Sequence, residues 1–171
     1  MNSDIIIHPI PPVYDQNSRV LVLGSFPSVR SRESGFFYGH RQNRFWRVLA
    51  DVCGTEAPVS IEEKKEMLLK NGIAVWDVIR SCEINGSADS SIKKVVPNDV
   101  CRIIKESRIE RSFTNGKKAE ELYKKYLENE TGIRSECLPS TSPANAAWSL
   151  ERLTEKWAVI MTDTKENGDV G

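Results

Sequence analysis

A short, unbroken apolar run at residues 20–23, Val-Leu-Val-Leu, constrains the fold most strongly, and it ends at Gly24. A strand with apolar side chains on both faces is typical of a parallel sheet that helices cover on both sides. Comparable strand patterns recur at residues 73–76, 109–114 and 133–138. The stretches between these strands carry helical spacing, so the chain is predicted to alternate strand and helix four times.

The first helical stretches are recognised by their spacing and by their start signals. Phe45, Leu49 and Cys53 recur every fourth residue, which predicts an amphipathic helix. A capping box at residues 60–63 starts the next helix, and Pro-Asn-Asp at residues 97–99 opens another.

Two further helices are expected in the last third of the chain. One passes through Leu122 and Tyr126. The other begins at Ser142-Pro143, which pairs a good N-cap with proline at the first helical position, and continues through Leu150 and Trp157. With right-handed crossovers, these elements predict an α/β fold, a three-layer α/β/α sandwich with a mostly parallel four-stranded sheet.

The length of 171 residues suits a single domain over residues 1–171, in which residues 162–171 are expected to form a frayed tail. No apolar run approaches the roughly 20 residues needed to cross a bilayer, so no membrane partner is expected. The cysteines form no C-x-x-C pair, which argues against a metal site with local ligand spacing and favours reduced thiols in the cytoplasm. We expect a monomer.

Basic and acidic residues balance at 24 each, and a net charge of zero counts mildly against a protein that coats nucleic acid. Between residues 30 and 47, however, five arginines stand against Glu33 alone. One local surface could therefore face phosphates, and its basic residues are Arg30, Arg32, Arg41, Arg44 and Arg47.

Function in such a sandwich is expected at the carboxyl ends of the strands. Polar residues, glycine and proline collect there, at residues 24–28, 77–79, 115–117 and 139–145. The sequence contains no G-x-G-x-x-G, Walker A, G-x-S-x-G or H-E-x-x-H motif. The commonest dinucleotide-binding, NTPase, hydrolase and zinc-protease interpretations are thereby excluded.

Two of these segments carry a family likeness. Gly24-Ser25-Phe26-Pro27-Ser28, followed by GFFYGHRQNRFW at residues 35–46, resembles the first motif of the uracil-DNA glycosylase superfamily. The PSTSPANA segment at residues 139–146 resembles the second motif, and residues 72–77 and 113–119 are similar to the intervening strands. Within the superfamily the chain is most similar to the DNA-deoxyinosine (hypoxanthine-DNA) glycosylases. This resemblance implies base excision, an α/β/α fold and no metal or organic cofactor.

The resemblance implies a catalytic role for Asn43. Other members of the superfamily place an Asp or Asn two residues after the first-motif glycine, where it holds the attacking water, but Phe26 occupies that place here. The family points instead to Asn43, whose carboxamide can accept from water and donate to the base or sugar. Judged from the residues alone, Asn43 also suits an N-cap for the helix that contains Phe45, and it could do both.

The resemblance further implies a pocket for a flipped base, with base-binding residues Ser25, Phe26, Tyr38, Asp77 and Asn115. Tyr38 is expected to stack on the base, and Asp77, which only accepts hydrogen bonds, suits the N1–H of hypoxanthine. Each has a structural alternative. Tyr38 could pack in the core, Asp77 could cap a helix after the second strand, and Asn115 could occupy a left-handed turn.

Contacts to DNA are implied for polar residues of both motifs, namely Ser28, His40, Arg41, Ser140, Ser142 and Asn145. Ser142 is expected both to bind phosphate and to cap the last helix. Arg41 stands where close relatives usually have proline, and Leu138 stands where some relatives carry a histidine that stabilises the leaving uracil.

The sequence therefore predicts a monofunctional DNA glycosylase that hydrolyses the N-glycosidic bond of deaminated bases, hypoxanthine foremost, in base-excision repair. Its partner is expected to be DNA containing a deaminated base. A uracil or mismatch-specific DNA glycosylase is one alternative. A catalytically idle DNA-binding module is the other, because Phe26 replaces the usual water-holding residue.

Overall fold

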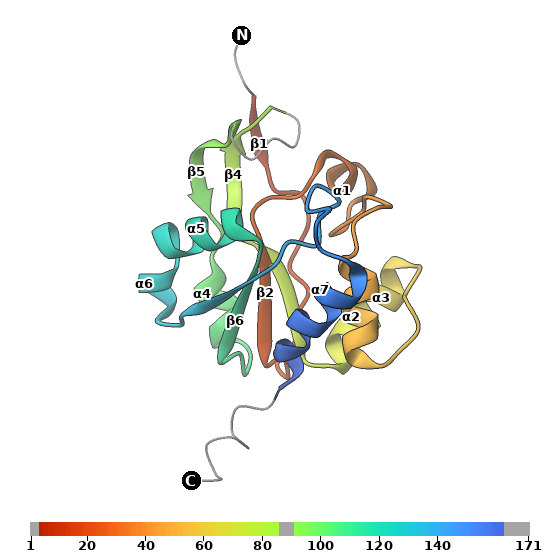
Figure 1. Ribbon diagram of the computed structural model, residues 1–171. Helices are drawn as coiled ribbons and strands as arrows, with labels where there is room; N and C mark the ends of the chain where they lie inside the picture. Colours follow the sequence, from red (N-terminus) through yellow and green to blue (C-terminus); the bar gives the residue numbers. More distant parts are fainter. Residues whose placement is uncertain (1–3, 86–90, 163–171) are drawn as a thin grey trace.

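The computed structural model describes residues 4–85 and 91–162, and its centre is a four-stranded sheet (Figure 1). The strand order is β3 (Ile73–Asp77), β2 (Val20–Gly24), β6 (Arg111–Asn115) and β7 (Ser135–Leu138). All three neighbouring pairs run parallel, which confirms the predicted sheet. Every residue of β2 and β3 is buried, and this is the physical reason for their unbroken apolar runs.

Helices cover both faces of this sheet (Figure 1). On one side lie α2 (Phe45–Cys53), α3 (Ile61–Lys70) and α7 (Leu150–Trp157). On the other side lie α4 (Val100–Lys105), α5 (Lys117–Tyr126) and α6 (Glu128–Thr131). A 3-10 helix, η2 (Ala158–Met161), follows α7. The α/β/α layering is thus confirmed.

A second, smaller sheet goes beyond what the sequence predicted. It consists of β1 (Ile5–Ile7), β4 (Ile79–Glu83) and β5 (Lys93–Pro97), paired antiparallel in the order β1-β4-β5. Only Val78 separates β3 from β4, so no turn signal marks where the chain passes from one sheet to the other. A short helix, α1 (Val29–Ser34), was also missed, because six residues are too few to show a helical period.

The predicted helix ends mostly agree with the structure. Gly54 closes α2 in a left-handed conformation with φ of 70°, which glycine adopts without steric cost. Ser60 Oγ accepts from the Glu63 backbone N–H, as a capping box requires. The Glu63 carboxylate, however, accepts from the backbone N–H of Val59 rather than from that of the cap residue.

The predicted start of the last helix at Ser142-Pro143 is wrong. Helix α7 begins at Leu150, and its cap is Ser149, whose side chain accepts from the Arg152 backbone N–H. The segment before it is held in turns, because the Arg44 guanidinium donates to main-chain carbonyls there, those of Ser142, Asn145 and Trp148. The Ser142 and Asn145 carbonyls also accept from the backbone N–H groups of Asn145 and Trp148, so the segment forms three-residue turns and the helix begins seven residues later than predicted.

Buried apolar side chains from both layers of helices and from the sheet form one cluster. Among the described residues, no helix has both the length and the apolar character needed to span a bilayer. The frayed tail predicted for residues 162–171 lies, from residue 163 onward, outside the described residues.

Candidate active site

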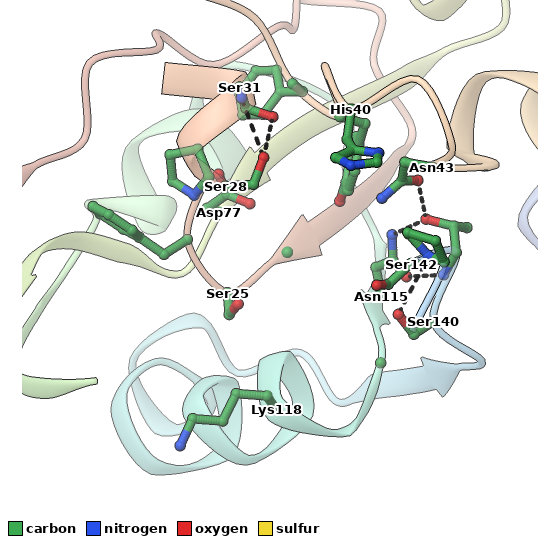
Figure 2. Close-up of a pocket in the computed structure, with 18 of the residues that line it drawn as sticks. Ser25, Ser28, Ser31, His40, Asn43, Asp77, Asn115, Lys118, Ser140 and Ser142 are labelled. Atoms are coloured by element: carbon green, nitrogen blue, oxygen red, sulfur yellow. Dashed lines mark hydrogen bonds between the residues drawn. The ribbon is translucent and has the colours of Figure 1, made fainter. Parts of the chain in front are cut away.

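A cavity of about 310 Å³ opens at the carboxyl edge of the parallel sheet (Figure 2). Its volume is at the lower end of the range of about 300–1,000 Å³ that is typical of small-molecule sites. Most of the predicted site residues line it: Ser25, Phe26, Ser28, Tyr38, His40, Asn43, Asp77, Asn115, Ser140 and Ser142. Arg41 and Asn145 do not. The structure thus brings together side chains from the loops after β2 and β7 and from the ends of β3 and β6.

Asn43 lines the cavity, and its side chain also bonds the first residue of α2, although the N-cap position of that helix is Arg44. Its catalytic role stays a prediction. Its Oδ1 accepts from the Phe45 backbone N–H at 3.0 Å and from Thr141 Oγ1 at 2.8 Å. A backbone N–H can only donate, so this contact fixes which end of the carboxamide is the oxygen. Figure 2 shows Nδ2 on the side of the cavity. Asn43 therefore presents a donor to a ligand, while its oxygen is already engaged by two donors.

Thr141 links Asn43 to Asn115, and it is the site residue that sequence reasoning missed most clearly. It is fully buried, and the backbone N–H of Thr141 donates to Asn115 Oδ1 while Asn115 Nδ2 donates to Thr141 Oγ1, both at 3.0 Å. Its hydroxyl then donates to Asn43 Oδ1, which completes a chain of hydrogen bonds from Asn115 through Thr141 to Asn43. We call Asn43, Thr141 and Asn115 the amide wall. In the sequence, the only indication of a role for Thr141 was its position between Ser140 and Ser142, which were predicted to bind DNA.

Asp77 ends β3 at the bottom of the cavity and is 3% exposed. Its Oδ2 lies 2.7 Å from His8 Nε2. Gly24 packs directly against it, because a Cβ at that position would lie 2.4 Å from Asp77 Oδ1 and 3.0 Å from the Tyr38 hydroxyl. The suggestion that Asp77 caps a helix is wrong, since the chain runs directly into β4.

Tyr38 lines the cavity with a strained backbone and a buried hydroxyl. Its φ is 52°, a left-handed value that is uncommon for residues other than glycine. One face of its ring stacks on Phe45 with the centroids 3.8 Å apart. Within the described residues its hydroxyl has no hydrogen-bond partner. Burial first, and then the charge of Asp77, raise the pKa of Tyr38 well above its ordinary value of 10.0, and the nearby amide of Asn115 opposes this by a smaller amount, so the phenol stays protonated. We call Asp77 and Tyr38, with His8 behind them, the cavity floor.

The serines of the first motif hold the protein's own loops. Ser28 caps α1 by accepting from the Ser31 backbone N–H at 3.2 Å, and its hydroxyl donates to Ser31 Oγ. Ser31 Oγ in turn accepts from the Gly39 backbone N–H at 3.0 Å. This chain ties the segment that carries Tyr38 to α1, which sets the position of one side of the cavity.

Several predicted roles change when the loop after β7 is seen in the fold. Ser142 does not cap the last helix; its Oγ accepts from the Ala144 backbone N–H at 3.2 Å. Asn145 lies outside the cavity and donates through Nδ2 to the Ser140 carbonyl at 3.0 Å. Asn115 does not occupy a left-handed turn, because Gly116 takes the positive φ of 93°. Contacts of these residues with DNA stay predictions.

The arginine-rich segment does not form one uniform phosphate-facing surface. Arg44 is turned inward to carbonyls of the loop after β7. Arg32 donates to the Pro27 carbonyl at 2.9 Å, and its guanidinium lies 5.5 Å from the centroid of the Phe26 ring. Positive charge at the cavity comes instead from Lys117 and Lys118, which the sequence analysis did not single out. Their signal was the position just after a strand-ending Asn-Gly pair.

No group of three or more metal-ligating side chains occurs among the residues that the structure describes.

Comparisons with known proteins agree with this arrangement. Residues 11–162 match the family model of the Uracil DNA glycosylase superfamily. A Hypoxanthine DNA glycosylase from Methanosarcina acetivorans is 37% identical over 153 residues, which cover 88% of this chain and 95% of the relative. One from Methanosarcina barkeri is 34% identical over 151 residues, which cover 86% of this chain and 93% of the relative.

A solved structure also resembles this protein. It is the solution NMR structure of a Methanosarcina acetivorans protein assigned to the uracil DNA glycosylases, with a TM-score of 0.78 and 33% identity. The superposition covers 92% of this chain and 98% of that one. Sequence, fold and the composition of the cavity therefore agree, and the chain belongs to the uracil DNA glycosylase superfamily.

Proposed function

We propose that this protein is a monofunctional DNA glycosylase that hydrolyses the N-glycosidic bond of deoxyinosine in DNA and releases hypoxanthine. The observation that carries the proposal is the gathering of Asn43, Asp77 and Asn115 around one cavity at the carboxyl edge of the sheet. The two relatives named Hypoxanthine DNA glycosylase support the choice of base, because they are similar to this chain over most of its length.

The reaction begins with base flipping, because a base stacked in a duplex cannot enter a cavity in the enzyme. Flipping costs a few kcal/mol and costs least for a mispaired base, which favours deaminated bases. As the bond to the base breaks, the sugar gains oxocarbenium character and the base gains negative charge. Fixed donors that face the departing base stabilise this distribution. We assign that role to Nδ2 of Asn43, since its oxygen is engaged by Phe45 and Thr141.

Groups at the mouth of the cavity are proposed to bind the phosphates that flank the flipped nucleotide. They are short polar side chains and two lysines, namely Ser28, His40, Ser140, Ser142, Lys117 and Lys118. Arg41 is exposed and follows His40 directly, so it is proposed to contact the backbone further from the flipped nucleotide. In this proposal the enzyme acts as a monomer in the cytoplasm.

A panel of defined lesions tests the proposal. Purified protein is incubated with duplexes that carry hypoxanthine, uracil, xanthine or only undamaged bases, and alkali with heat then cleaves each abasic site. We expect hypoxanthine to be released fastest and undamaged bases to be retained. A borohydride trap is included, and no covalent adduct is expected, because a monofunctional enzyme forms no Schiff base with the sugar.

The outcomes separate the candidate functions. Equal or faster release of uracil would replace the proposal with a uracil or mismatch glycosylase. Retention of every base, with DNA binding intact, would identify a catalytically idle binding module.

A further inference from the structure

His8 is a buried residue near the cavity to which neither the sequence motifs nor the proposed mechanism gives a role. Its side chain is 2% exposed and lies among aromatic rings, with its ring centroid 5.8 Å from that of Phe26 and 6.0 Å from that of Phe37. Phe26 is the residue that replaces the usual water-holding Asp or Asn. Phe26, which departs from the family pattern, therefore forms part of the apolar environment of His8.

The contacts of His8 fix its tautomer. The backbone N–H of Ile10 donates to Nδ1 at 3.2 Å, so Nδ1 carries no proton. Nε2 then carries the only ring proton and donates it to Asp77 Oδ2 at 2.7 Å. The proton on Nε2 therefore points at the carboxyl group of Asp77, and the lone pair of Nδ1 points at the main chain.

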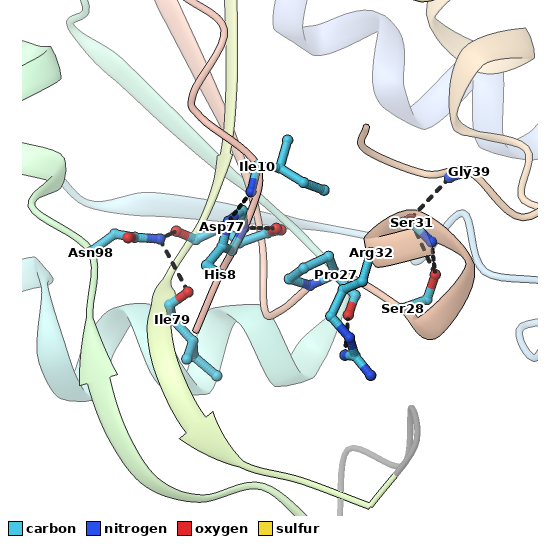
Figure 3. A network of polar contacts seen from close by, with 10 residues as sticks. All are labelled: His8, Ile10, Pro27, Ser28, Ser31, Arg32, Gly39, Asp77, Ile79 and Asn98. Atoms are coloured by element: carbon cyan, nitrogen blue, oxygen red, sulfur yellow. Dashed lines mark hydrogen bonds and ion pairs between the residues drawn. The ribbon is translucent and has the colours of Figure 1, made fainter. Parts of the chain in front are cut away.

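Asp77 is held by His8 through its side chain and by Asn98 through its main chain (Figure 3). The side chain of Asn98, which is 4% exposed, donates to the main-chain carbonyls of Asp77 at 2.8 Å and Ile79 at 3.1 Å. His8 holds the carboxylate through Oδ2, and within the described residues Oδ1 has no hydrogen-bond partner. The second oxygen is thus an immobile acceptor beside the cavity.

The Tyr38 hydroxyl lies close to this oxygen, since both atoms surround the point next to Gly24 where a Cβ would be. It is a buried donor without a partner within the described residues. A buried polar group without a partner costs free energy until a ligand or water completes it. A group that offers an acceptor to the Tyr38 hydroxyl next to a donor for Asp77 would complete this pair.

We propose that His8 is a positioning residue, which holds Asp77 so that its free oxygen, beside the Tyr38 hydroxyl, accepts the N–H of a lactam base and thereby selects hypoxanthine over adenine. Hypoxanthine presents O6 as an acceptor next to N1–H as a donor. Adenine presents the reverse, an amino donor next to the N1 acceptor, so the carboxylate of Asp77 would face the lone pair of N1 and this contact becomes repulsive. This inference rests on the proposed glycosylase function and adds the device that discriminates against adenine.

Two substitutions of His8 isolate the contact with Asp77. His8→Gln keeps an N–H donor at the position of Nε2, whereas His8→Phe keeps an aromatic ring and removes the donor. Both lose the acceptor for Ile10, so that loss does not distinguish them, and only His8→Gln keeps the donation to Asp77. In single-turnover cleavage of a deoxyinosine duplex, we expect His8→Phe to be slower by roughly 10- to 100-fold and His8→Gln to keep most of the wild-type rate. DNA binding, measured by titration of the same duplex, should change little.

Asp77→Asn provides a second test that does not leave a buried charge unpaired. His8 can donate only to the oxygen of the new carboxamide, so the amide nitrogen turns toward the cavity and opposes the N1–H of the base. We expect a loss of hypoxanthine release of about 100-fold or more with little change in melting temperature. Adding His8→Gln should recover part of the rate, because a second carboxamide can rotate and accept from the new nitrogen.

The results separate this inference from the proposed function. Wild-type protein that releases no hypoxanthine would overturn the proposed function and this inference with it. Wild-type protein that releases hypoxanthine, together with an Asp77→Asn variant that is equally fast, would overturn this inference alone. If His8→Phe and His8→Gln lose rate equally, while both melt at the wild-type temperature, the positioning role is also wrong.

Discussion

The two sides of the cavity differ in how far their polar groups are satisfied. In the amide wall, the side chains of Asn43, Thr141 and Asn115 bind one another, and the oxygen of each amide is engaged. In the cavity floor, one oxygen of Asp77 and the hydroxyl of Tyr38 lack partners within the described residues. A satisfied network keeps its geometry with or without a ligand, whereas an unsatisfied pair gains contacts when a ligand arrives. The comparison assigns rigidity to the wall and base recognition to the floor.

The largest effect is expected from the removal of Asn43, which tests the role of the amide wall. Asn43→Ala deletes a preorganised donor, and loss of such a group typically costs about 2.7–4 kcal/mol, or roughly 100- to 1000-fold in rate. It also removes the oxygen that accepts from the first backbone N–H of α2, and loss of such a contact costs about 0.5–2 kcal/mol of stability. Single-turnover cleavage, thermal melting and DNA titration on the same preparation separate the two effects. A variant that melts early but cleaves at close to the wild-type rate would leave Asn43 with a structural role only.

Thr141→Val tests whether the amide wall depends on its central hydrogen bonds. The substitution keeps the shape of the side chain and removes the hydroxyl that joins the two amides. We expect about 1–3 kcal/mol lower stability. The cleavage rate should fall by roughly tenfold, as Asn43 loses one of the two contacts that orient it.

Thr114→Val is the matched control for this change. Thr114 is also fully buried, but its hydroxyl donates to Glu120 and it does not line the cavity. It should lose stability and keep its cleavage rate. A normal rate in Thr141→Val would show that the wall does not need its central hydroxyl.

Tyr38→Phe tests the cavity floor, and its expected effect on stability has the opposite sign to that of Thr141→Val. The lost hydroxyl has no partner within the described residues, so we expect stability to stay the same or rise slightly, while release of hypoxanthine slows by about threefold to tenfold. Tyr123→Phe is the matched control, because the Tyr123 hydroxyl is bonded to Thr131 and to the Ile133 carbonyl outside the cavity. It should be less stable by about 1 kcal/mol and cleave normally. Equal changes of stability and cleavage rate in the two variants would contradict the special role of the Tyr38 hydroxyl in the cavity floor.

The smallest expected effect is on alkaline stability. Burial and the charge of Asp77 raise the folded-state pKa of Tyr38 above the unfolded value of about 10, so its contribution is complete below pH 10. Above pH 10 the unfolded state loses a proton that the folded state keeps, and stability falls by about 1 kcal/mol per pH unit. Denaturant titrations between pH 9 and 11 should show a shallower loss in Tyr38→Phe than in wild type. Identical slopes would mean that this hydroxyl ionises freely in the folded protein.

The layout of the fold was predictable wherever burial leaves a period in the sequence. The apolar run of β2 and the spacing of Phe45, Leu49 and Cys53 each reflect a face that is hidden from water. The second sheet was not predictable in this way, because β4 follows β3 without a turn signal. The start of α7 was misplaced because the competing contacts come from Arg44, about a hundred residues away in the sequence.

The candidate site was predictable as a set of residues but not as a geometry. Family motifs and strand ends named Asn43, Asp77 and Asn115, which do share one cavity. The sequence could not tell that the oxygen of Asn43 is engaged, because its partner Thr141 comes from another loop. His8 was missed for the same reason, since it lies 69 residues before its partner Asp77 and outside the motif segments.

The hydrogen bonds of Arg44 to the loop after β7 affect how much entropy this loop loses on binding. Each residue that a flexible loop must order on binding would cost about 1–2 kcal/mol of backbone entropy. Here a single guanidinium binds three carbonyls of that loop. A loop held by the protein's own contacts has less backbone entropy to lose when it binds a partner.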